Sequence, residues 1–129
     1  YLLTGSANLI PIEKTLTVRS TQSRAAIIDA QNLSQALVIQ GSNSVVEGFT
    51  VRHGTSGGFG GGLSVERACT VRDCLVTSNR AWGGGGVVVL GEATNARIER
   101  CAIVGNQAAA IGGGVRALAD PGSVADSSQ

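Results

Sequence analysis

The residues best suited to chemistry in this 129-residue chain lie beside its glycine-rich runs. Arg52 and His53 close an apolar stretch ahead of one run, and Arg80 opens the segment that leads into the next. Phe59 and Trp82 each stand immediately before three or more glycines. Cationic and aromatic side chains so placed offer the charged and stacking contacts that a glycan uses. The structural alternative is that His53 is simply solvated and that the two aromatic residues fill a corner of the fold.

The acidic residues suggest no catalytic or metal-binding set. The chain has four Asp and five Glu, and two of the Asp, Asp120 and Asp126, fall in a small, polar C-terminal segment. The glycine runs lack the Lys-Ser/Thr of a phosphate-binding loop and the Asp of a glycine-rich calcium repeat. We therefore expect no catalytic residue, metal or cofactor. The net charge of +1 with scattered arginines indicates neither nucleic acid nor membrane insertion.

An internal repeat of about 25 residues organises the chain. Three stretches align, SVVEGFTVRHG at 44–54, CTVRDCLVTSN at 69–79 and ARIERCAIVGN at 96–106. Each is followed by a glycine run, FGGGL at 59–63, WGGGGV at 82–87 and IGGGV at 111–115. Apolar residues alternate within each unit, which is strand periodicity, and a unit of this size cannot bury its apolar face alone. The units must therefore stack on one another.

This pattern predicts an all-β fold, a right-handed single-stranded parallel β-helix of four to five coils. Each coil would have three short strands, two meeting at a corner and a third after the glycines. Equivalent strands of successive coils would pair in parallel about 4.8 Å apart, stacking Val46, Val71 and Ile98 in the interior. The glycines would mark a sharp turn where any Cβ meets the neighbouring coil.

Two sets of residues are expected to stack at the corners of the coils. Phe59, Trp82 and Ile111 precede the glycines and would share one rung that covers a corner of the core. Asn79 and Asn106 end equivalent strands and would form a hydrogen-bonded ladder.

Charged residues provide an independent check on the register. Arg19, Glu47, Arg72 and Glu99 fall at one outward site with alternating signs, worth about 0.2–1 kcal/mol per neighbouring pair. Glu47 and Glu99 would lie about 10 Å apart with Arg72 between them. That separation is beyond the geometry of an inverting glycosidase, and Asp73 has no acidic neighbour one coil away. These carboxylates are therefore interpreted as structural.

The remaining apolar residues divide into an inward and an outward set. Cys74 and Cys101 would stack inward as reduced core residues, in poor geometry for a disulfide. The outward set would form either a partner surface or the place where further chain packs, and comprises Leu75, Val88, Leu90, Ala102, Val104 and Leu118.

With these motifs, the sequence resembles the right-handed β-helix repeat proteins of the bacterial surface, of the polymorphic outer-membrane protein and pectate-lyase-like type. The GGA-plus-aliphatic motif of the former appears as GGGL at 60–63 and GGGV at 84–87 and 112–115, with Gly replacing Ala. Its F-x-x-N motif appears as VTSN at 76–79 and IVGN at 103–106, with Val or Ile replacing Phe. The opening YLLTGSANLIPIEKTLTVRS is similar to the first coil of pectate-lyase-like proteins.

The resemblance implies secretion and an extracellular or bacterial cell-surface location, although no signal peptide is recognisable. We expect a non-catalytic segment, an adhesin passenger, stalk or glycan-binding module, whose partner is a polysaccharide or host-surface glycan. Its candidate ligand contacts are Arg52, His53, Phe59, Arg80 and Trp82. The alternative is a fragment of a polysaccharide lyase or glycoside hydrolase whose catalytic residues lie mostly outside this segment.

The expected domain organisation is a β-helix segment over 1–118, as part of a longer solenoid, followed by a tail or linker over 119–129. The open ends of such a segment would contact flanking coils or associate with each other.

Overall fold

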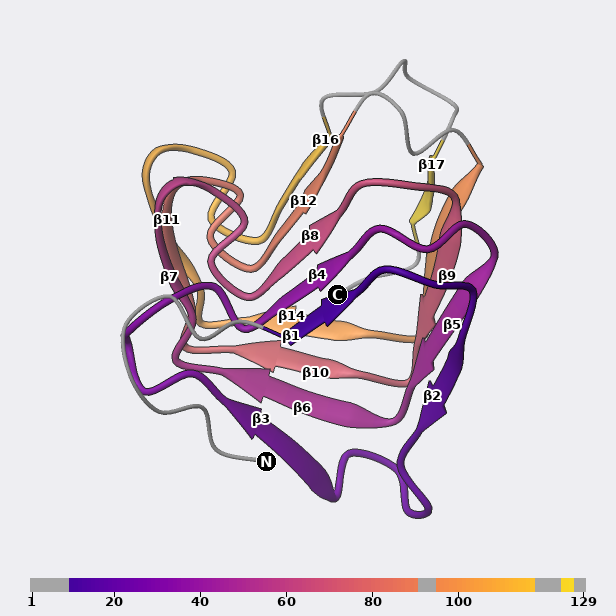
Figure 1. The fold of residues 1–129 in the computed structure, drawn as a ribbon. Helices are drawn as coiled ribbons and strands as arrows, with labels where there is room; N and C mark the ends of the chain where they lie inside the picture. Colours follow the sequence, from indigo (N-terminus) through magenta and orange to yellow (C-terminus); the bar gives the residue numbers. More distant parts are fainter. Residues whose placement is uncertain (1–9, 91–94, 118–123, 127–129) are drawn as a thin grey trace.

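The computed structural model describes residues 10–90, 95–117 and 124–126, which form a parallel β-solenoid of about four turns. Figure 1 shows the successive coils stacked along a common axis. Every strand pairing among these residues is parallel and joins a strand to its equivalent in a neighbouring coil. The prediction of an all-β solenoid with a repeat of about 25 residues is confirmed.

The strands form four sheets, each named here after one member. The β4 sheet contains β1 (Ile10–Ile12), β4 (Leu37–Ile39), β8 (Leu63–Val65), β12 (Val87–Val89) and β16 (Val115–Ala117). The β6 sheet contains β3 (Ala26–Asp29), β6 (Phe49–Arg52), β10 (Leu75–Thr77) and β14 (Ala102–Val104). The β9 sheet contains β2 (Thr17–Arg19), β5 (Ser44–Glu47), β9 (Cys69–Arg72), β13 (Ala96–Glu99) and β17 (Val124–Asp126). The β11 sheet contains β7 (Thr55–Phe59), β11 (Arg80–Gly83) and β15 (Gln107–Ile111).

The β11 sheet corrects the prediction of three strands per coil, because four sheets give four strands per coil. Its strands occupy the segment between the end of a β6-sheet strand and the glycine run. That segment shows no apolar alternation, as TSGGF in β7 and QAAAI in β15 illustrate. Pairing of its backbone with the next coil, rather than side-chain burial, makes it a strand.

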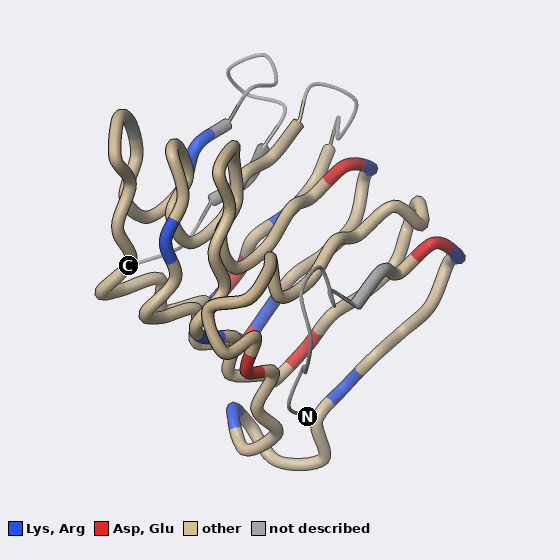
Figure 2. Tube along the Cα trace, turned by 60° about the vertical axis from the view of Figure 1, so that its left-hand side comes forward, with Lys and Arg blue, Asp and Glu red and all other residues tan. Residues whose placement is uncertain are grey.

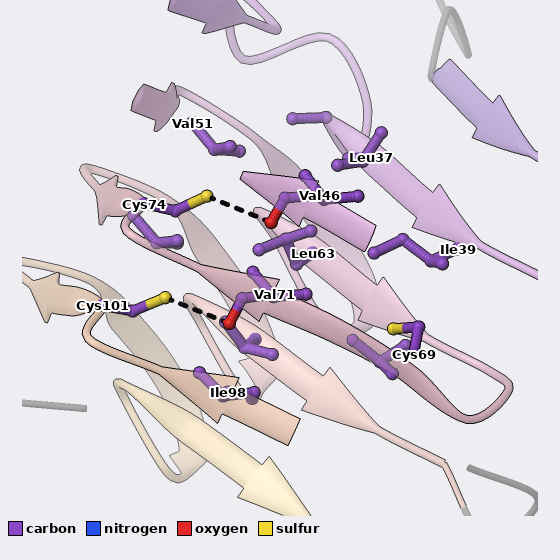
Figure 3. Packing of buried hydrophobic residues seen from close by; sticks show 14 of the residues in the cluster. Leu37, Ile39, Val46, Val51, Leu63, Cys69, Val71, Cys74, Ile98 and Cys101 are labelled. Atoms are coloured by element: carbon purple, nitrogen blue, oxygen red, sulfur yellow. Dashed lines mark hydrogen bonds between the residues drawn. The ribbon is translucent and has the colours of Figure 1, made fainter. Parts of the chain in front are cut away.

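The predicted inward stack lies at the centre of the core. Val46 pairs with Val71, which pairs with Ile98, and each of the three is 1% exposed. Figure 3 shows these side chains one above another, with Leu37 and Leu63 of the β4 sheet facing them. The sequence-based register is therefore confirmed for the core.

Cys69, Cys74 and Cys101 are free, buried thiols, as predicted for Cys74 and Cys101. Cys74 and Cys101 occupy equivalent inward positions and donate to the carbonyl oxygens of Val46 at 4.0 Å and Val71 at 3.6 Å (Figure 3). Contact with the Cys101 thiol and burial both raise the pKa of the Cys74 thiol. Burial raises the pKa of the Cys69 thiol to about 12. Protonated and enclosed, Cys69 and Cys74 behave as small apolar residues.

The predicted asparagine ladder is present beneath the glycine runs. Asn79 Nδ2 donates to Asn106 Oδ1 at 3.0 Å and to the carbonyl of Val51 at 3.1 Å. A Cβ on Gly62 would lie 2.8 Å from Asn79 Nδ2, and one on Gly86 would lie 2.8 Å from Asn106 Nδ2. The glycines are thus required by close approach of the chain to this ladder, as the sequence indicated.

The predicted charge ladder follows the register of the β9 sheet. Arg19 pairs with Glu47, Glu47 with Arg72, and Arg72 with Glu99 along the strands. Arg72 Nε lies 3.0 Å from Glu47 Oε1, and Arg19 Nη1 lies 4.0 Å from Glu47 Oε2. Glu99 contacts Arg97 of its own strand at 2.7 Å. Figure 2 shows that acidic and basic residues are interspersed over the coils and not gathered in one place.

The predicted aromatic rung was wrong for Trp82. The register pairs Gly83, not Trp82, with Phe59 and with Ile111, whose side chain lies outside the described set. Trp82 is 47% exposed, so it does not cover the core. The run after Trp82 has four glycines where the others have three, and matching the aromatic residues therefore misplaced Trp82 by one position.

The outward apolar set is only partly exposed. Val88 points outward from the β4 sheet but is 1% exposed, because Gly60 lies so close that a Cβ there would be 2.6 Å from Val88 Cγ1. The glycine-rich segment therefore covers this position, which corrects the expectation of a free surface there. Val104 is 47% exposed, while the other described members are half-buried, namely Leu75, Leu90 and Ala102; Leu118 lies outside the described residues.

Candidate functional site

The outer face of the β11 sheet presents the two most prominent candidate residues. Along β11, Arg80 and Trp82 are exposed and alternate with buried Ala81 and Gly83. The strand begins directly after Asn79, whose buried amide anchors the backbone through the ladder. Strand alternation therefore sends Arg80 and Trp82 outward on the same side.

Small residues surround Trp82 on both sides. The register shifts between Ala81 and Gly83, so Trp82 stands opposite two residues of each neighbour, 57–58 in β7 and 109–110 in β15. These are two glycines and two alanines. Because such residues have little or no side chain, the indole stands beside open space on its own sheet.

Phe59 and Arg116 support the indole from the side of the glycine run. The Phe59 and Trp82 ring centroids are 5.5 Å apart at an interplanar angle of 74°, an edge-to-face contact. The Arg116 guanidinium lies 5.3 Å from the centroid of the Phe59 ring. Phe59 therefore contacts both Trp82 and Arg116, and its predicted role as a direct ligand contact stays a prediction.

Two hollows flank Arg80 on this face. The larger, called here the outer hollow, has a volume of about 780 Å³ and is lined by residues 55–57, 80–82, 106–109 and 113. The smaller, of about 460 Å³, is lined by Asn32, Ser78, Asn79 and Gly105 together with Arg80 and Gln107. Arg80 and Gln107 thus border both hollows.

Arg52 and His53 belong to a different cluster. Asp29 Oδ2 lies 2.9 Å from Arg52 Nε, and Asp29 Oδ1 lies 3.0 Å from His53 Nδ1. Burial by itself raises the pKa of Asp29, but the Gln31 N–H and the side chains of Arg52 and His53 outweigh it and hold that pKa below its ordinary value. Neither Arg52 nor His53 is among the described residues lining the outer hollow.

Sequence reasoning overlooked both Asp29 and the small residues beside Trp82. Asp29 pairs with Arg52 one coil on, so extending the repeat one unit towards the N-terminus would have found it. The role of Gly57 and Ala109 depends on the bulge in the β11 sheet, for which the aligned motifs give no signal.

Several other described carboxylates have ion-pair or hydrogen-bond partners. Besides Glu47 and Glu99, Asp73 pairs with Arg100 at 2.9 Å, and Glu66 accepts from Gln40 at 2.8 Å. The hydrogen bond from Arg100 lowers the pKa of Asp73. Within 10–90, 95–117 and 124–126, no three His, Cys, Asp or Glu residues group as metal ligands.

No family model, curated protein or solved structure matches the chain. The parallel β-solenoid is therefore established by the structure alone. In the described part of the chain, no helix has the length and hydrophobicity that crossing a bilayer requires.

Proposed function

We propose that the chain is a glycan-binding segment of a secreted or cell-surface β-solenoid, and that the outer hollow is its binding face. The location follows from the resemblance to bacterial surface β-helix proteins. The binding role is inferred from the side chains that line the outer hollow.

The observation that carries the proposal is the exposed indole of Trp82 beside Arg80 in an open hollow. An aromatic side chain that is 47% exposed leaves much of its apolar surface in water, which stacking against a sugar ring would remove. Thr55, Ser56 and Gln107 supply neutral hydrogen-bonding groups along the same hollow. Aromatic stacking combined with polar contacts is the chemistry that sugar recognition needs.

The test uses Trp82 as its own reporter, because it is the one tryptophan of the chain. Screening neutral and acidic oligosaccharides against the purified protein should change its fluorescence with at least one of them. For the same ligand, calorimetry should show binding lost in Trp82→Ala and retained in Leu16→Ala. Leu16 is a matched control because it is also an exposed apolar side chain, at 46%. Equal loss in both variants would contradict the assignment of the face.

The enzyme alternative predicts a different result. A lyase or hydrolase fragment would release new reducing ends from the bound oligosaccharide, whereas a binding module would leave the oligosaccharide intact. Reducing-sugar measurement on the bound mixture separates the two functions.

A further inference from the structure

We propose, building on the glycan-binding function, that the outer hollow binds a linear glycan along the solenoid axis. In this proposal, Arg80 binds one acidic group on the sugar unit that lies over the middle coil. Glycan binding as such requires neither this orientation of the glycan nor an acidic group on it. Each follows from a separate observation.

The orientation follows from the register of the β11 sheet. Thr55, Arg80 and Gln107 occupy equivalent positions in three successive coils, and residues 57–58, 82 and 109–110 form a parallel second row. Both rows contribute to the lining of the outer hollow. Since neighbouring strands lie about 4.8 Å apart, the hollow repeats along the axis at roughly that interval. An extended chain laid along the axis therefore meets one set of contacts per coil.

The charge follows from a comparison of the nine arginines. Five of them pair with a carboxylate, namely Arg19, Arg52, Arg72, Arg97 and Arg100, and Arg24 donates to the backbone carbonyl of Arg100. Arg67 donates to the carbonyl of Glu66, and Arg116 lies over the ring of Phe59. Among the described residues, Arg80 alone has no such partner, although its guanidinium is exposed between two hollows.

An unpaired guanidinium in a binding hollow selects an anionic group. Its planar fork binds a carboxylate or a sulfate through two parallel hydrogen bonds, which an uncharged hydroxyl cannot reproduce. Arg80 is also the one charged residue among the described lining residues of the outer hollow. The equivalent residues in the coils on either side, Thr55 and Gln107, are neutral. Of these three positions, only that of Arg80 can therefore form an ion pair with an acidic sugar.

The experiment compares oligosaccharides that differ only in acidic groups, with Trp82 fluorescence as the signal. One arm uses xylo-oligosaccharides with and without a single glucuronate, and a fully acidic oligogalacturonate of the same length. A second arm uses sulfated galactan oligosaccharides before and after chemical desulfation. The acidic member should bind about two- to five-fold tighter than its neutral counterpart, the range of one exposed ion pair, and the advantage should shrink with added salt.

Variants assign that advantage to Arg80. Arg80→Gln should weaken binding of the acidic member to the level of the neutral one in the same variant, and Arg80→Lys should keep part of the preference for the acidic member. Arg19→Gln removes the same charge from the β9 sheet, where the side chain is 68% exposed, and should leave the preference intact. Affinity should rise from two to three sugar units and then level off, and the fully acidic chain should bind no tighter than the singly acidic one.

The outcomes separate this proposal from the function on which it rests. Equal affinity for the neutral and acidic oligosaccharides would contradict the proposed ion pair with Arg80, but it would not contradict glycan binding. A preference that survives in Arg80→Gln, or affinity independent of length, would likewise overturn this proposal. Failure of every oligosaccharide in this panel and in the wider screen would remove both.

Discussion

At the scale of single residues, the chain couples its charges to its register. Asp29, Glu47 and Asp73 each face cations that lie one coil away. Such pairs form only when the coils stack in the correct alignment, so they penalise slippage by a whole strand position. Asp29 differs from the other two because its side chain is only 11% exposed.

The pH dependence of stability should therefore report on Asp29. Its pKa is lower in the folded state, so its stabilising contribution is complete above the ordinary carboxyl value and is lost as the pH falls through the folded value. We expect Asp29→Asn to lower the free energy of unfolding by about 1–3 kcal/mol at pH 7, because Arg52 and His53 lose a charged partner.

Denaturant unfolding between pH 7 and pH 2.5 provides the measurement. The gap between wild type and Asp29→Asn should narrow only below about pH 4, where the Asp29 carboxylate of the unfolded chain begins to gain its proton while that of the folded chain stays ionised. A gap that stays constant across this range would show that the ionised carboxylate of Asp29 does not stabilise the fold.

At the scale of elements, glycines of the runs are needed for close packing, whereas a glycine of β7 lies beside open space. A Cβ on Gly86 would lie 2.8 Å from both Asn106 Nδ2 and the carbonyl oxygen of Gly114. A Cβ on Gly57, in β7, would meet nothing within 4 Å. The two glycines therefore have different physical reasons for being there.

Alanine substitution at these two positions should separate those reasons. Gly86→Ala should destabilise the protein by about 1–3 kcal/mol, because the asparagine ladder and the next coil must move apart. Gly57→Ala should stay within about 0.5 kcal/mol of wild type. Thermal or denaturant unfolding of the pair checks this, and equal effects of the two substitutions would contradict the close-packing explanation for Gly86.

At the scale of the whole molecule, the β11 sheet has two edges with different chemistry in the described part of the chain. β7 and β15 are the outer members of the β11 sheet, and the side chain of Gln35 donates to the carbonyls of Phe59 and Gly60 beyond β7. β15, with the sequence QAAAI, carries no charge that would discourage pairing with another strand.

We therefore expect the 129-residue chain to self-associate as its concentration rises, through contacts between its ends. Sedimentation velocity over a hundred-fold concentration range should show a rising sedimentation coefficient. A single monomeric species throughout would mean that both ends are sufficiently protected in this chain.

The repeat in the sequence determined the parallel solenoid, the inward stack through Val46, Val71 and Ile98, the charge ladder and the asparagine ladder. Those features depend on the spacing of residue types along the chain, because equivalent positions of successive coils must lie over one another. Arg80 and Trp82 were predicted as ligand contacts from their positions beside the glycine runs, and the structure places both on the outer face of the β11 sheet.

The tertiary structure decided how the candidate residues are grouped. It tied Arg52 and His53 to Asp29, turned Phe59 into a support for Trp82, and covered Val88 with Gly60. The position of Trp82 and its contact with Phe59 depend on the additional strand in each coil and on the bulge opposite Trp82. Both arise from backbone pairing in segments whose side chains show no periodic pattern, so only the folded chain reveals them.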